Sequence, residues 1–139
     1  MSARVRWLLV IPASLLAWLA VLLIGIVAHG YAEKALCPPD DLVSGFCDNA
    51  TAQAKLEVLF FAIAALSAIA VVGASVAMAP TNKSAVAWTA VAIGSLVAFM
   101  LAGVSVVWLS AVVAGTLAAV AATVYPLRPN PSINTDAAR

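Results

Sequence analysis

Charged residues are scarce in this chain. Only 9% of its 139 residues are Asp, Glu, Lys or Arg, and 65% are hydrophobic, whereas soluble domains carry roughly 25% charged residues. So few polar side chains cannot cover a surface that faces water, and the composition therefore predicts lipid surroundings. The seven basic residues are spread along the chain and the formal net charge is +1. This distribution argues against a nucleic-acid partner, because phosphate binding needs clustered Lys and Arg.

The sequence also lacks the residue clusters on which most catalytic chemistry depends. Its one histidine and six acidic residues form no metal-ligand pattern, and there is neither a nucleophile beside a base nor a glycine-rich phosphate loop. No charged residue falls in the middle of an apolar segment, although ion-coupled transporters and proton pumps usually need one there. We therefore expect no catalytic residue, no metal and no cofactor, and the sequence favours a role other than that of an enzyme.

Four long apolar segments dominate the sequence. About 20 helical residues cross a hydrocarbon core of about 30 Å, and the segments 7–29, 56–79, 85–101 and 105–125 fit this requirement. A polar turn over 80–84 separates the second segment from the third, and Gly103 marks a second turn over 102–104. The sequence thus predicts an all-α, antiparallel bundle of four transmembrane helices. The alternative is three spans, with one long tilted helix or a re-entrant segment after residue 84.

The positions of Lys and Arg predict the orientation, because short cytoplasmic loops are enriched in these residues. Five of the seven fall on one side of the four spans, and only Lys34 and Lys55 fall on the other. We therefore expect residues 1–6, the turn and the tail 126–139 to be cytoplasmic, in a bacterial inner membrane. The first span is longer than the apolar region of a signal peptide, so we expect it to be retained. The five basic residues on the cytoplasmic side are Arg4, Arg6, Lys83, Arg128 and Arg139.

The predicted outer loop, residues 30–55, contains both cysteines of the chain, Cys37 and Cys47. The outer compartment is oxidising and neither thiol has another cysteine to choose, so the sequence predicts a disulfide that closes the loop. Pro38, Pro39 and Asp40 lie between them and favour a turn. Redox catalysis is disfavoured, because membrane thiol oxidoreductases relay electrons from a closely spaced cysteine pair to a second pair. Free thiols or bonds to a partner are the remaining alternatives.

A few polar residues lie where the first two spans reach the outer boundary. His29 ends the first span and Glu57 begins the second, and neighbouring antiparallel helices would bring them together with Tyr31 and Glu33. Ionisable residues at a membrane are candidates for function, so these four residues form a possible outer polar site. The alternative is structural: Glu57 favours the positive end of its helix, and both groups reach interfacial water.

The fourth span carries two ladders of small residues spaced by four, which places each ladder on one helix face. Such faces let another helix approach closely, and close approach drives helix association in lipid. The ladders either hold only this bundle together or also contact other chains or copies. The predicted packing residues are Ser110, Ala111, Ala114, Gly115, Ala118, Ala119 and Ala122.

Together these features favour a non-catalytic membrane subunit that packs through small-residue faces into a larger complex or a homo-oligomer, surrounded by membrane lipids. Two alternatives stay open. One is a small transporter or channel component with Glu57 and His29 at its outer mouth. The other is a membrane enzyme that acts on a lipid or quinone with polar groups at its outer edge.

Overall fold

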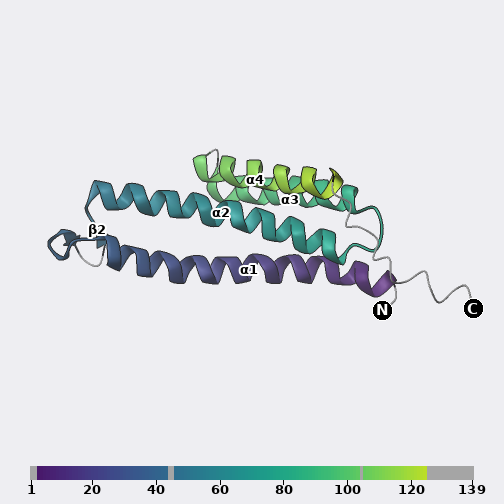
Figure 1. Ribbon diagram of the computed structural model, residues 1–139, viewed down its shortest axis with the longest axis horizontal. Coiled ribbons are helices and arrows are strands. Elements are labelled where there is room, and N and C mark those ends of the chain that lie inside the picture. The colour runs from purple at the N-terminus through teal and green to yellow at the C-terminus, as the bar shows by residue number, and fades with distance from the viewer. Residues whose placement is uncertain (1–2, 44–45, 104, 125–139) are drawn as a thin grey trace, which may run out of the picture.

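In the computed structural model, four long helices make up most of the chain (Figure 1). The structure describes residues 3–43, 46–103 and 105–124. Each of the four helices is long and apolar enough to cross a membrane, so the all-helical prediction is confirmed. The helices are α1 (Ala3–Leu36), α2 (Ala50–Met78), α3 (Lys83–Ala102) and α4 (Val106–Val124). A short 3-10 turn, η1 (Pro39–Asp41), and two short strands, β1 (Leu42–Val43) and β2 (Phe46–Cys47), connect α1 to α2.

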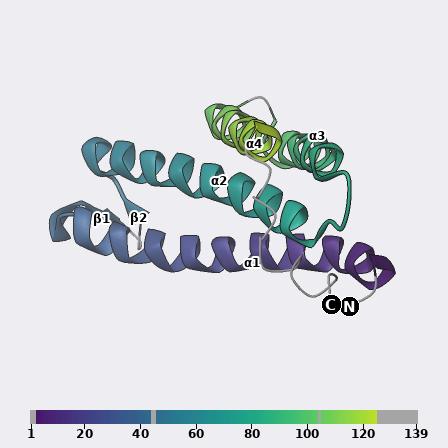
Figure 2. The ribbon, with the colours of Figure 1, turned by 45° about the vertical axis from the view of Figure 1, so that its right-hand side comes forward.

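Helix α2 is central to the arrangement. Helix α1 packs against α2, and the α3–α4 pair packs against α2 as well. Figure 2 shows α2 between α1 and this pair. Among the described residues α1 has no interface of comparable extent with α3 or α4. Helix α2 is therefore the main packing partner of α1.

The two halves of the fold differ in length. Helices α1 and α2 have 34 and 29 residues, which at 1.5 Å per residue corresponds to about 51 and 44 Å. Helices α3 and α4 have 20 and 19 residues, or about 30 Å each, close to the thickness of a hydrocarbon core. At one end α2, α3 and α4 lie nearly level and α1 projects beyond them, whereas at the other end α1 and α2 extend well past the α3–α4 hairpin (Figure 1).

The extension consists of residues that hydropathy had assigned to the outer loop. Helix α1 continues to Leu36, beyond the predicted limit at 29, and α2 begins at Ala50, before the predicted start at 56. The segment 31–36 remains helical because Ala, Glu, Lys and Leu favour helices even though they are not all apolar. Hydropathy locates the end of the apolar region and not the end of a helix. Of the predicted loop 30–55, only 37–49 lies outside the helices.

The long uncharged stretch after residue 84 contains two separate helices. Helix α3 ends at Ala102, and Gly103 has a φ of 61°, in the left-handed region that glycine adopts without steric cost. The Gly103 N–H donates to the carbonyl of Phe99, as is common at helix C-termini. Beyond the turn, the hydroxyl of Ser105 accepts from the N–H of Trp108 and caps α4. One long tilted helix over this stretch is therefore excluded.

The core between α2, α3 and α4 consists of small side chains. Val72 and Val76 of α2 cluster with Ala87 of α3 and Ala119 of α4, and neither alanine has any exposed surface. Small side chains let helix backbones approach closely, which favours helix association in lipid.

The predicted packing residues of α4 lie along this interface. A Cβ built on Gly115 would lie 3.6 Å from the side chain of Ala68 and 3.7 Å from that of Val91, so the glycine faces both α2 and α3. The buried members of the ladders thus pack inside this chain. Ala114, Gly115 and Ala119 are buried, and Ser110, Ala111, Ala118 and Ala122 are partly buried.

Polar contacts join the N-terminal part of α1 to the C-terminal part of α2. The hydroxyl oxygens of Ser14 and Ser75 lie 2.8 Å apart, and Ser75 is buried. The Arg6 guanidinium donates to the carbonyl of Ala77 at 3.2 Å. This carbonyl belongs to the last turn of α2, where a cation is favoured by the helix dipole.

A glycine on α1 fits a branched side chain on α2, and we expect Gly25→Ala to weaken this interface. An added Cβ would lie 2.7 Å from Cγ2 of Ile63, which is attached to a stiff branched carbon and cannot move away alone. Overpacking of this kind costs about 1–3 kcal/mol. Thermal unfolding in mild detergent should show a lower midpoint for Gly25→Ala.

Gly73→Ala is the matched control for this change, because nothing lies within 4 Å of a Cβ at that glycine. In an Ile63→Ala background, Gly25→Ala should cost less than it does in the native chain. Equal midpoints for the native chain and Gly25→Ala would contradict the close packing of α1 on α2.

Candidate functional site

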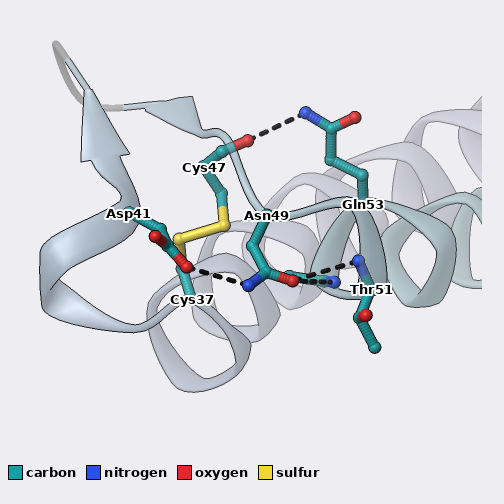
Figure 3. Close-up of a disulfide and its surroundings, with 7 residues drawn as sticks. Cys37, Asp41, Cys47, Asn49, Thr51 and Gln53 are labelled. Carbon is teal, nitrogen blue, oxygen red and sulfur yellow. Dashed lines mark hydrogen bonds between the residues drawn. A yellow bond between two sulfur atoms is a disulfide. The ribbon is translucent and has the colours of Figure 1, made fainter.

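A disulfide cap lies at the overhanging end of α1 and α2 (Figure 3). Cys37 follows α1 and Cys47 ends β2, and the two residues form the predicted disulfide, with their Cα atoms 5.8 Å apart. Strands β1 and β2 pair antiparallel and so turn the chain back toward α2. Both cysteines are buried and cluster with Ala52, and the side-chain amide of Gln53 donates to the Cys47 carbonyl at 2.9 Å.

Asn49 fixes the start of α2 to this cap. Its Oδ1 accepts from the N–H groups of Thr51 and Ala52 at 3.0 and 3.1 Å, which is the usual role of an N-cap residue. Its Nδ2 donates to Oδ2 of Asp41 at 2.8 Å, as Figure 3 shows. Both ends of the Asn49 amide are therefore used, and two of the N–H groups at the beginning of α2 already have partners.

Beside the cap, the flanks of α1 and α2 form an open hollow of about 600 Å³. Helix α1 contributes His29 and Glu33, α2 contributes Glu57, and α4 contributes Val107 from its first turn. The hollow thus lies where the α1–α2 overhang meets the end of the shorter α3–α4 hairpin. The remaining lining residues are Cys47, Ala50, Gln53, Ala54, Leu56 and Phe60.

Three of the four residues predicted for an outer polar site line this hollow. His29 and Glu33 are four residues apart on α1 and share a face, and Glu57 meets them from α2. Tyr31 does not belong to the lining, and its side chain is 73% exposed. Two residues from His29 along a helix, Tyr31 points to a different side of α1.

Sequence reasoning missed Gln53 and Phe60, which also line the hollow. They lie four residues before and three residues after Glu57, so helical spacing would have placed them on the same face. Gln53 was overlooked because hydropathy had placed it in a loop and not in a helix.

The lining of the hollow combines negative charge with apolar surface. It has two carboxylates, from Glu33 and Glu57, and includes no Lys or Arg. Lys34 and Lys55, which adjoin the lining residues in the sequence, are both exposed and lie outside it. The apolar part consists mainly of Leu56, Phe60 and Val107.

The His29 ring has an incomplete set of partners. It lies against Phe60, with the ring centroids 4.5 Å apart and the planes inclined at 44°. Its Nδ1 is buried and has no hydrogen-bond partner among the residues that the structure describes. A buried polar atom without a partner costs about 1–3 kcal/mol and is rare in native proteins. The position of this ring against Phe60 therefore carries an energetic cost.

Over residues 3–43, 46–103 and 105–124, no three His, Cys, Asp or Glu side chains are grouped closely enough to hold a metal ion. The chemistry that the hollow offers is hydrogen bonding, negative charge and contact with aromatic and aliphatic side chains.

Comparisons of the chain with protein-family models, with curated proteins and with solved structures found no match. Its role is therefore inferred from the residues and the geometry described above.

Loss of the disulfide should destabilise the cap. Closing an 11-residue loop contributes about 2.8 kcal/mol in the chain-entropy model, and the bond also keeps β2 next to the end of α1. The chain with Cys37→Ser and Cys47→Ser should unfold at a lower temperature than the oxidised native chain, measured in mild detergent. A reductant should lower the native midpoint to that of the double variant and leave the double variant unchanged. Alkylation of both cysteines in the unreduced native chain would contradict the assignment.

Proposed function

We propose that this chain is a non-catalytic subunit of a larger membrane assembly. In this proposal it crosses a bacterial inner membrane four times, with successive helices antiparallel and both termini in the cytoplasm. The excess of Lys and Arg on one side of the four apolar segments supports the orientation. The disulfide cap then lies in the oxidising outer compartment, where such bonds persist.

The exposed surface of the helices supports a lipid environment. Leu8 on α1, Val58 on α2, Leu101 on α3 and Leu117 on α4 each expose more than 60% of their surface. In water, the exposure of each such side chain costs about 1.5–3 kcal/mol of free energy relative to the fully buried side chain. Hydrocarbon removes this penalty, so the same surface is stable only inside a membrane or against another apolar protein.

The observation that carries the subunit proposal is an unused small-residue face on α2. Gly73 and Ala77 are both exposed and four residues apart, and a Cβ at Gly73 would meet nothing within 4 Å. Glycine inside a helix is unfavourable unless close backbone approach compensates for it. Gly25 and Gly115 are compensated within the chain, whereas Gly73, like Gly30 of α1 and Gly94 of α3, is not. A helix from another chain or copy that packs here would supply the missing contact.

This face is long enough to accept a whole helix. Its exposed positions recur every three or four residues, as on one side of an α-helix. They run along α2 from near the hollow to its last turn, with the small residues Ala62, Gly73 and Ala77 toward its two ends and the larger Leu66 and Ile69 between them.

The hollow with Glu33 and Glu57 is the feature that favours the transporter or channel alternative. A transport path would have to continue from it through the membrane-spanning part. Its lining residues come from the overhanging end of α1 and α2 and from the first turn of α4, so the subunit role is preferred. The alternative of an enzyme that acts on a lipid or quinone depends on the same polar groups.

Filling the α2 face should separate the chain from its partner without unfolding it. In gentle detergent the native chain should co-purify with stoichiometric unrelated proteins, or with a tagged second copy of itself. Gly73→Leu should lose this association while keeping its thermal midpoint, since the added side chain meets only open space within the chain. Ala121→Leu, which adds similar bulk at an exposed position of α4, is the matched control and should keep the partner. Recovery of the native chain as a lone monomer with its own activity would count against the proposal.

The proposed orientation can be read from single introduced thiols. The described residues contain no free cysteine, so in a chain with Cys37→Ser and Cys47→Ser one new cysteine is the only reactive site. Thr51→Cys, beside the cap, should react with a membrane-impermeant maleimide added to intact cells. Ser84→Cys, in the first turn of α3, should react only after the membrane is opened. The reverse pattern would invert the proposed topology.

A further inference from the structure

We propose that the hollow beside the disulfide cap binds a primary alkylammonium group and that a membrane aminolipid supplies it. A free short-chain amine carries the same charged group and is the alternative source. The inference depends on the proposed membrane placement of the helices and does not depend on the partner subunit.

The charge of the lining selects a cation. Glu33 and Glu57 contribute two carboxylates to one hollow, and no Lys or Arg side chain in the lining neutralises them. A cation in the hollow would be attracted by both carboxylates, and at a membrane boundary, where the dielectric constant falls, this attraction is stronger than in water.

The hydrogen-bonding groups favour a primary ammonium over a quaternary one. A primary ammonium has three N–H donors, and carboxylates accept hydrogen bonds but cannot donate them when ionised. Gln53 adds an acceptor, because its Nε2 is used by the Cys47 carbonyl while its Oε1 stays free to accept. The Phe60 ring, which lies against His29, offers the face of an aromatic ring to a cation.

The position of the hollow relative to the hairpin favours a lipid as the source of the ammonium. Val107, in the first turn of α4, belongs to the lining, and α3 and α4 are each about as long as the hydrocarbon core is thick. With that hairpin spanning the membrane, the hollow opens at the level of the outer headgroups. Its apolar residues Leu56, Phe60 and Val107 would then adjoin the glycerol backbone and upper acyl chains of a lipid whose headgroup meets the carboxylates.

Two competing ligands fit less well. An anion such as a free phosphate would be attracted to the beginning of α2, but Asn49 already accepts from the N–H groups of Thr51 and Ala52, and the nearby carboxylates repel it. A divalent metal needs a tighter group of ligands than the described residues provide.

Lipid binding to the purified full chain tests the inference. The chain in neutral detergent micelles is titrated with phosphatidylethanolamine, phosphatidylcholine or phosphatidylglycerol, and bound lipid is counted by native mass spectrometry alongside the thermal midpoint. Phosphatidylethanolamine should be retained and should raise the midpoint, and the other two should do neither. Glu57→Gln and Glu33→Gln should each weaken its apparent affinity about ten-fold or more, because each removes a charged hydrogen-bond acceptor.

Asp40→Asn is the matched control, since Asp40 is an exposed carboxylate of the cap that lies outside the lining, and its affinity should equal that of the native chain. Equal binding of all three lipids, or unchanged affinity in both Glu variants, would overturn the inference. Ethanolamine that binds as tightly as the lipid would support the ammonium site and overturn the lipid as its source. These measurements use the chain without a partner, so their failure leaves the co-purification result unaffected.

Discussion

The fold depends on close approach of helix backbones to α2 from two directions. On one side the Ile63 side chain packs against Gly25 of α1, and on the other Gly115 of α4 packs against Ala68. In the proposed lipid surroundings no hydrophobic force would drive the helices together, so packing of this kind would supply much of the association energy. Without it, α1 would have no interface of comparable extent among the described helices, and the hollow between α1 and α2 would not exist.

The register between α1 and α2 is fixed at both ends by different chemistry. At one end the Arg6 guanidinium meets the last turn of α2, and at the other the disulfide joins Cys37 to Cys47. A slide of one helix turn is about 5.4 Å, which the covalent bond and the glycine contact at Gly25 both oppose. His29 and Glu57 therefore face the same hollow because contacts elsewhere hold the two helices, since these two side chains make no hydrogen bond to each other.

The sequence predicted those features that depend on local composition. Four apolar helices follow from hydropathy, and the pairing of Cys37 with Cys47 follows from there being only two cysteines. The overhang could not be predicted, because residues 31–36 and 50–55 are polar enough to resemble a loop yet helical by propensity. The inclusion of Gln53 in the hollow, and the exclusion of Tyr31, depend on how α1 and α2 face each other. That orientation is set by long-range contacts such as the one between Gly25 and Ile63.

The two proposed uses of α2 are compatible because they lie on different sides of the helix. Sixteen residues separate Glu57 from Gly73, and at 3.6 residues per turn this spacing rotates one side chain about 160° from the other. Helix α1 and the α3–α4 pair occupy the two flanks between them. A helix packed on Gly73 would therefore leave the hollow open, and an amine bound beside Glu57 would not touch that helix. Any coupling between partner binding and amine binding would have to pass through α2 itself. A variant that loses one kind of binding should therefore keep the other.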